Sequence, residues 1–115
     1  MDYSKIYPKA LTNLFPDASL RAEAEAILSQ YSANEGLRVK TAILKVAGSN
    51  LEEIRRCTEA ACLDFRDVLS WAEYPAQLEA GFGVNDPSLV KQDKKQYQAW
   101  IDGMLAVQQP PERDK

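Results

Sequence analysis

The sequence contains no histidine among its 115 residues. Histidine is the commonest general acid or base, the commonest transition-metal ligand and the side chain that titrates near neutral pH. Its absence excludes many familiar enzymatic and metal-binding arrangements, including the Glu-x-x-His pairs of helical dimetal sites. Glycine-rich phosphate-binding loops, nucleophile elbows and zinc-type cysteine pairs are missing as well. We therefore expect a protein that is not an enzyme and that holds no metal and no cofactor.

The chain also lacks an excess of basic residues and a long apolar run. It has 14 lysine and arginine residues against 17 aspartate and glutamate residues, so the formal net charge is −3. Proteins that bind nucleic acid usually gather a basic excess on one face, so this charge argues against such a partner. No stretch approaches the roughly 18 apolar residues of a membrane span, and the N-terminus has no signal-peptide pattern. We expect a cytoplasmic protein with no membrane contact.

Cysteine is scarce, and the two that occur do not suit a disulfide. Cys57 and Cys62 lie five residues apart on one predicted helix, about 140° apart around its axis at about 100° per residue. Side chains in those positions cannot easily bridge each other. Cysteine near an apolar helix face is usually a small core residue, and we expect that role for both.

What the sequence does contain is helical periodicity over most of its length. Apolar residues recur at steps of three and four, and Gly48 and Pro75 stop the pattern where helices should end. The predicted helices cover residues 8–15, 17–33, 36–48, 50–74 and 86–108. The sequence thus predicts an all-α single domain over residues 1–108, a bundle of four to five mostly antiparallel helices, with a disordered tail at 109–115. The side chains expected at the centre of the core are Leu44, Ile54, Phe65, Val68 and Trp100.

The predicted long helix, residues 50–74, has apolar residues on two sides. The main stripe runs from Leu51 to Ala72 and is typical of a core face. A second side carries Leu63, Trp71 and Tyr74 beside Asp67, a mixture of aromatic anchors and charge that is common at protein interfaces. The bundle itself could cover this second side, or it could be offered to a partner.

Candidate interaction residues follow from that second side. They are Leu63, Asp67, Trp71 and Tyr74, together with Phe82, which stands between two glycines in the 75–85 connection and could anchor a partner or plug the bundle. The carboxylates of the long helix lie off the main stripe, and we expect them to be solvated: Glu52, Glu53, Glu59, Asp64, Asp67 and Glu73. In the 36–48 helix the expected exposed strip is Arg38, Thr41 and Lys45.

The leading functional hypothesis is a non-enzymatic protein–protein interaction module, with a second copy of the chain as one candidate partner. The first alternative is a small-ligand carrier or small enzyme with a pocket near the 75–85 loop. The second is a nucleic-acid regulator resembling a helix-turn-helix, formed by residues 37–47 and the helix that follows. The acidic start Leu51-Glu52-Glu53 of that following helix would repel phosphates, which weakens this alternative.

Overall fold

The computed structural model describes residues 1–81 and 86–106. Within those ranges all regular structure is α-helical, which confirms the predicted all-α class. The described part holds seven helices, so the predicted count of four to five is wrong. The helices are α1 (Tyr3–Leu14), α2 (Ala18–Leu28), α3 (Gly36–Ala47), α4 (Leu51–Leu63), α5 (Phe65–Glu73), α6 (Pro75–Ala80) and α7 (Pro87–Ala106). The predicted tail at 109–115 lies outside the described residues.

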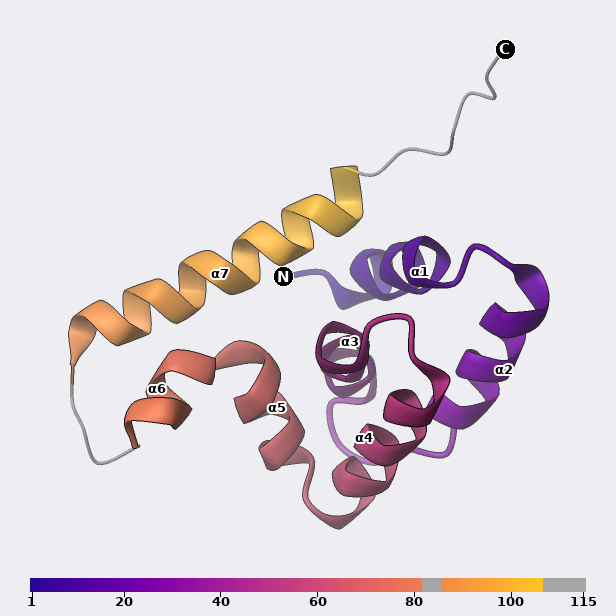
Figure 1. The fold of residues 1–115 in the computed structure, drawn as a ribbon, viewed down its shortest axis with the longest axis horizontal. Coiled ribbons are helices and arrows are strands. Elements are labelled where there is room, and N and C mark those ends of the chain that lie inside the picture. Colours follow the sequence, from indigo (N-terminus) through magenta and orange to yellow (C-terminus); the bar gives the residue numbers. More distant parts are fainter. Residues whose placement is uncertain (82–85, 107–115) are drawn as a thin grey trace.

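The arrangement is centred on α3. Helices α1, α4 and α5 pack against it, and α2 packs mainly on α4 (Figure 1). Helices α6 and α7 lie to one side, where α7 runs along α1 and α6 and touches α5. None of the helices in the described part is both long enough and apolar enough to cross a membrane.

The core of the molecule lies where the first five helices meet. Leu44, Ile54 and Val68 are fully buried there, as predicted. Phe65 and Trp100 were expected at the centre but are only partly buried and pack against its edge. Phe65 is the first residue of α5 and therefore sits at the end of its helix, while Trp100 lies on the peripheral α7.

The largest departure from the predicted fold is the break in the 50–74 helix at Asp64. Its backbone is extended, with φ −157° and ψ 102°, and its N–H closes α4 by donating to the carbonyl of Ala60 at 2.9 Å. The chain then turns before α5 begins at Phe65. This corner allows both α4 and α5 to pack against α3, which a straight helix of the same length could not do because its far end would leave the domain.

The first two helices also differ from the prediction. Helix α1 begins at Tyr3 with Asp2 as its cap, so Pro8 lies inside the helix rather than in its first turn. Pro8 is exposed and donates no backbone hydrogen bond, which lowers the stability of this part of the helix. Helix α2 ends at Leu28, earlier than the predicted residue 33. Tyr31 is nevertheless buried in the apolar core, and its hydroxyl donates to the carbonyl of Asn34 at 2.6 Å within the connection.

Helix ends with a local sequence signal lie where expected. The Asn50 side chain accepts from the N–H of Glu53 at 3.1 Å and caps α4. Gly48 ends α3 with a positive φ of 62°, a conformation that glycine adopts without strain. Asp86 accepts from the N–H of Ser88 at 2.9 Å, and Pro75 occupies the first turn of α6.

Candidate interaction surface

The corner between α4 and α5, residues 63–65, is held by one side chain that serves the second helix. The Asp64 carboxylate accepts from the backbone N–H of Arg66 at 3.0 Å and from its guanidinium at 3.1 Å. The hydrogen bonds from Arg66 lower the pKa of Asp64, although the carboxylate lies on the surface. A carboxylate at a helix N-terminus also interacts favourably with the helix dipole, so Asp64 both ends α4 and starts α5.

Leu63 projects from this corner into solvent. It is 90% exposed, more than any other large apolar side chain in the described part of the chain. Beside it lies a surface depression of about 470 Å³ between the end of α2, the connection that follows it and the corner; we call it the corner depression. Its lining consists of residues 30–33 and 61–66. The exposed Leu63 side chain, which we call the knob, and the corner depression therefore lie next to each other.

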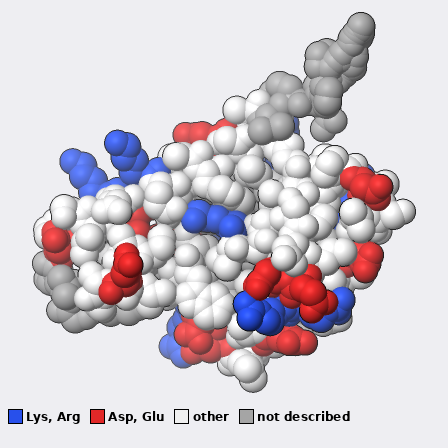
Figure 2. All heavy atoms as spheres, viewed as in Figure 1, with Lys and Arg blue, Asp and Glu red and all other residues white. Residues whose placement is uncertain are grey.

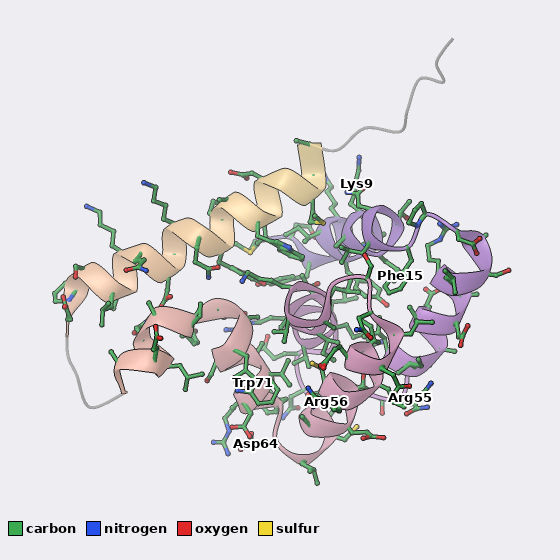
Figure 3. The ribbon with its side chains drawn as sticks, in the orientation of Figure 1. Lys9, Phe15, Arg55, Arg56, Asp64 and Trp71 are labelled. Atoms are coloured by element: carbon green, nitrogen blue, oxygen red, sulfur yellow. The ribbon has the colours of Figure 1, made fainter. Side chains whose placement is uncertain are left out.

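The other predicted interaction residues do not all share that place. Trp71 is 40% exposed on α5. Figure 3 shows it in the lower part of the molecule, which also holds Asp64 at the corner and Arg56 on α4. Tyr74 is 36% exposed and lines a different depression. Asp67 is exposed, and among the described residues its carboxylate bonds no tyrosine or indole. Phe82 lies outside the described residues.

A second depression was not foreseen from the sequence. It measures about 490 Å³ and lies where α1, α3, α5 and α7 meet; we call it the tyrosine depression. Its lining consists of Met1, Tyr3, Glu35, Arg38, Glu73, Tyr74, Lys94 and Tyr97. These residues come from widely separated parts of the chain.

A bidentate ion pair lies in the tyrosine depression. The Nε of Arg38 donates to Glu73 Oε2 at 2.8 Å, and its Nη2 donates to Oε1 at 2.6 Å. These bonds raise the pKa of the Arg38 guanidinium. Glu73 was expected to be solvated but is only 8% exposed, so that expectation is wrong. Thr41 is likewise buried, because its hydroxyl donates to the carbonyl of Leu37 within the helix.

Two tyrosines bridge α1 and α7 beside that pair. The hydroxyls of Tyr3 and Tyr97 are 3.2 Å apart and hydrogen-bond each other. Burial raises the pKa of Tyr3 and of Tyr97, so both hydroxyls lose their protons only at a higher pH than an exposed tyrosine does. The Tyr97 ring also stacks on Trp100, with ring centres 6.3 Å apart. Sequence periodicity places Tyr97 on a packing face, but it gives no signal that Tyr3 would meet it.

Charged groups are spread unevenly over the surface. Arg55 and Arg56 on α4 pair with Glu52 and Glu53 one turn earlier, at 3.8 and 2.6 Å. Figure 2 shows a basic patch surrounded by uncharged atoms in the middle of this face, acidic and basic side chains mixed at the lower right, and basic side chains at the upper left, over α7. The pairing on α4 leaves few cations free to attract an anionic partner there.

The cysteines and carboxylates form no metal site in the described part of the chain. Cys57 is buried as expected, and burial raises the pKa of its thiol. Cys62 was also expected in the core but is exposed at the end of α4, so that expectation is wrong. Both thiols are free.

Comparisons with other proteins add no assignment to this geometry. The chain matches no protein-family model, no curated protein and no solved structure. A functional proposal for this protein therefore depends on its own residues.

Proposed function

We propose that this protein is a non-enzymatic interaction module that associates with itself through the corner between α4 and α5. The observation that supports the proposal is the exposure of Leu63, which is 90% exposed on a well-defined helix corner. A leucine side chain gains about 2 kcal/mol when it is fully buried. A contact that buries Leu63 would therefore be favourable without any change in the fold.

A second copy of the chain offers a place for that side chain. The corner depression lies directly beside Leu63 and includes Tyr31, Ala33 and Phe65 in its lining. In a dimer with two-fold symmetry the same patch is used by both copies. Each Leu63 would then enter the corner depression of the other copy, and the two contacts would form together.

The charges at the corner favour the same arrangement. Asp64 and Arg66 carry opposite charges two positions apart in the patch, and their side chains, which pair with each other, are 39% and 77% exposed. A two-fold axis through the corner would bring the Asp64 of each copy near the Arg66 of the other. Exposed pairs of this kind contribute about 0–1 kcal/mol each, so they would orient the contact more than strengthen it.

Two variants test this proposal from both sides of the contact. Leu63→Ser removes the knob, and Ala33→Arg blocks the depression while Leu63 stays in place; both positions are exposed, so neither change should disturb the fold. Sedimentation equilibrium from about 10 µM to 1 mM covers weak dissociation constants. We expect the wild type to form dimers in this range and each variant to remain a monomer.

Mixing the variants adds a sharper test. A pair made of one Leu63→Ser chain and one Ala33→Arg chain keeps a single knob in a single depression, so the mixture should associate more than either variant alone and less than the wild type. Leu20→Ser on α2 is the matched control, because Leu20 is 45% exposed but lies away from the corner. A wild type that stays monomeric at 1 mM, or an equal effect of Leu20→Ser, would overturn the proposal.

A nucleic-acid regulator is the weaker proposal. The basic side chains in the first half of α4, Arg55 and Arg56, are paired with Glu52 and Glu53 of the same helix. A helix that enters a DNA groove needs free cations for the phosphates. The pairing supports a protein partner over a nucleic-acid partner.

A further inference from the structure

The tyrosine depression has the size of a small-molecule site. Its volume of about 490 Å³ lies within the roughly 300–1,000 Å³ that is typical of ligand pockets. Four helices contribute to it, so its shape depends on the tertiary fold rather than on one loop. It lies away from the corner that carries the proposed self-association, and the two sites share no residue.

The buried ion pair gives this depression a fixed wall. Three nitrogens of Arg38 are already engaged, two with Glu73 and one with Glu35 at 3.3 Å. The two carboxylates outweigh the single guanidinium charge, so this cluster offers a ligand no positive charge, and Lys94 is the group in the lining that can receive an anion. The bidentate geometry instead holds α3 and α5 together at the base of the site.

The groups left free in the depression are hydrogen-bond donors. Lys94 has no ion pair or hydrogen bond with any other described residue. In the bond between Tyr3 and Tyr97 only one hydroxyl donates, so the other keeps a free O–H. The hydroxyl of Tyr74 likewise has no partner in the described part of the chain. One ammonium and phenolic O–H groups are the donors that a carboxylate accepts from.

Aromatic surface accompanies these donors. Tyr74 and Tyr97 lie in the lining, and Tyr97 is backed by Trp100 in a stacked pair with 13° between the ring planes. Tyr97 is only 7% exposed, so Tyr74, which is 36% exposed, supplies most of the aromatic surface that a ligand ring can reach. Lys91 and Lys95 are exposed on the same helix as Lys94 and add positive potential along α7, where Figure 2 shows basic side chains.

We propose that the tyrosine depression binds a small aromatic carboxylate. The ring of the ligand packs against Tyr74, with the small exposed part of Tyr97 beside it, and its carboxylate lies at Lys94 and the free tyrosine O–H. A neutral aromatic molecule would leave the ammonium unmatched, and a small anion without a ring would leave the aromatic wall in water. The site requires both parts of the ligand.

Phenylacetate is the probe, with phenylacetamide and acetate as matched controls. Phenylacetamide keeps the ring but loses the charge, and acetate keeps the charge but loses the ring. Trp100 reports on the site by fluorescence because it stacks on Tyr97, provided that Trp71, on the exposed face of α5, is first replaced by phenylalanine. We expect phenylacetate to bind at least about tenfold more tightly than either control, because phenylacetamide loses the charge-assisted hydrogen bond and acetate loses the apolar surface of the ring.

Two variants locate the ligand within the site. Lys94→Gln should weaken phenylacetate binding about tenfold or more, whereas Lys95→Gln, next to it but outside the lining, should change binding less than about twofold. Tyr97→Phe keeps the ring and loses the hydroxyl, and it should weaken binding about fivefold. Neither lysine variant should change the sedimentation of the protein, which separates this proposal from self-association.

Specific results would overturn the proposal. Equal binding of phenylacetate and phenylacetamide would remove the role of the carboxylate, and equal binding of acetate would remove the role of the ring. Equal effects of Lys94→Gln and Lys95→Gln would place the anion outside the depression. Absence of any Trp100 response to phenylacetate, confirmed by calorimetry, would exclude the site altogether.

Discussion

The first five helices and the last two are held together by different forces. Helices α1 to α5 share one large apolar cluster, in which α3 supplies Val39, Ala42, Ile43 and Leu44 with no exposed surface. Helix α7 has a much smaller apolar contact with α1, Ile6 with Tyr97 and Ile101, and adds the partly buried Trp100 and Met104 at the edge of the large cluster. Hydrogen bonds account for much of the remaining contact between the last two helices and the rest of the domain.

These polar bonds are specific and well distributed. The buried Asp93 carboxylate on α7 accepts from the N–H groups of Ala76 and Gln77 at 2.8 and 3.0 Å, and so caps α6. At the other end of α7, Asn13 donates from α1 to the carbonyl of Met104 at 2.6 Å. Apolar packing is non-directional and grows with area, whereas each of these bonds depends on one geometry. The two regions should therefore respond differently to substitution.

The largest effect is expected from a cavity at the centre of the first region. Leu44→Ala should lower the free energy of unfolding by about 2–5 kcal/mol, because the neighbours of a fully buried leucine relax only partly into the space left behind. The change should weaken the whole domain, and denaturant unfolding measures it. Leu37→Ala on the same helix is the control, since Leu37 is exposed. A similar loss in both variants would show that α3 is not the centre of the core.

A smaller and more local effect is expected from the second region. Asp93→Ala should destabilise the protein by about 2–3 kcal/mol, because it leaves the N–H groups of Ala76 and Gln77 without their acceptor. Amide hydrogen exchange should become faster in α6 and α7 and stay slow in α3. Asp102→Ala, an exposed position on the same helix, should change neither. Faster exchange throughout the domain would show that both regions open as one unit.

The buried tyrosines should have the smallest effect on the stability of the protein at neutral pH. Their effect on stability should grow at high pH. Burial raises the pKa of Tyr7 to about 12 and also raises the pKa of Tyr3 and Tyr97. A raised folded pKa contributes stability that is fully present below the unfolded pKa, about 10, and is lost as pH rises toward the folded pKa. Stability measured by denaturant should therefore fall between about pH 10 and 12.

Single substitutions assign that loss to the two regions. Tyr7→Phe acts on the large cluster and Tyr97→Phe on the small contact between α1 and α7. Each should reduce the fall in stability at high pH, since phenylalanine has no proton to lose. Unchanged stability from pH 9 to 11 in the wild type would contradict the burial of these hydroxyls.

The sequence predicts those parts of the fold that depend on neighbouring residues. Asn50 and Asp86 mark helix starts and Gly48 a helix end, because a cap is formed within a few residues. Leu44 and Ile54 were identified as core because periodicity reports the buried face of a helix directly.

Features that depend on distant residues were missed. Arg38 and Glu73 are 35 positions apart, and neither residue carries a local signal that it will be paired and buried. Asp93 stands in a run of charged residues that is typical of a solvated face, yet it is 1% exposed because α6 covers it. The break at Asp64 was missed because the apolar spacing continues through it, and its local signal is a single aspartate that can cap the start of α5.

Asp64 also sets how freely this chain can vary. One position must end a helix, hold an extended backbone and accept the first N–H bond of the next helix. A short side chain with an acceptor oxygen meets all three requirements, so serine, threonine and asparagine are the natural substitutes. Alanine or leucine there would favour a continuous helix and pull α5 from α3. Many exposed positions can accept other residues without changing the fold. A change at residue 64, by contrast, would alter the path of the whole chain.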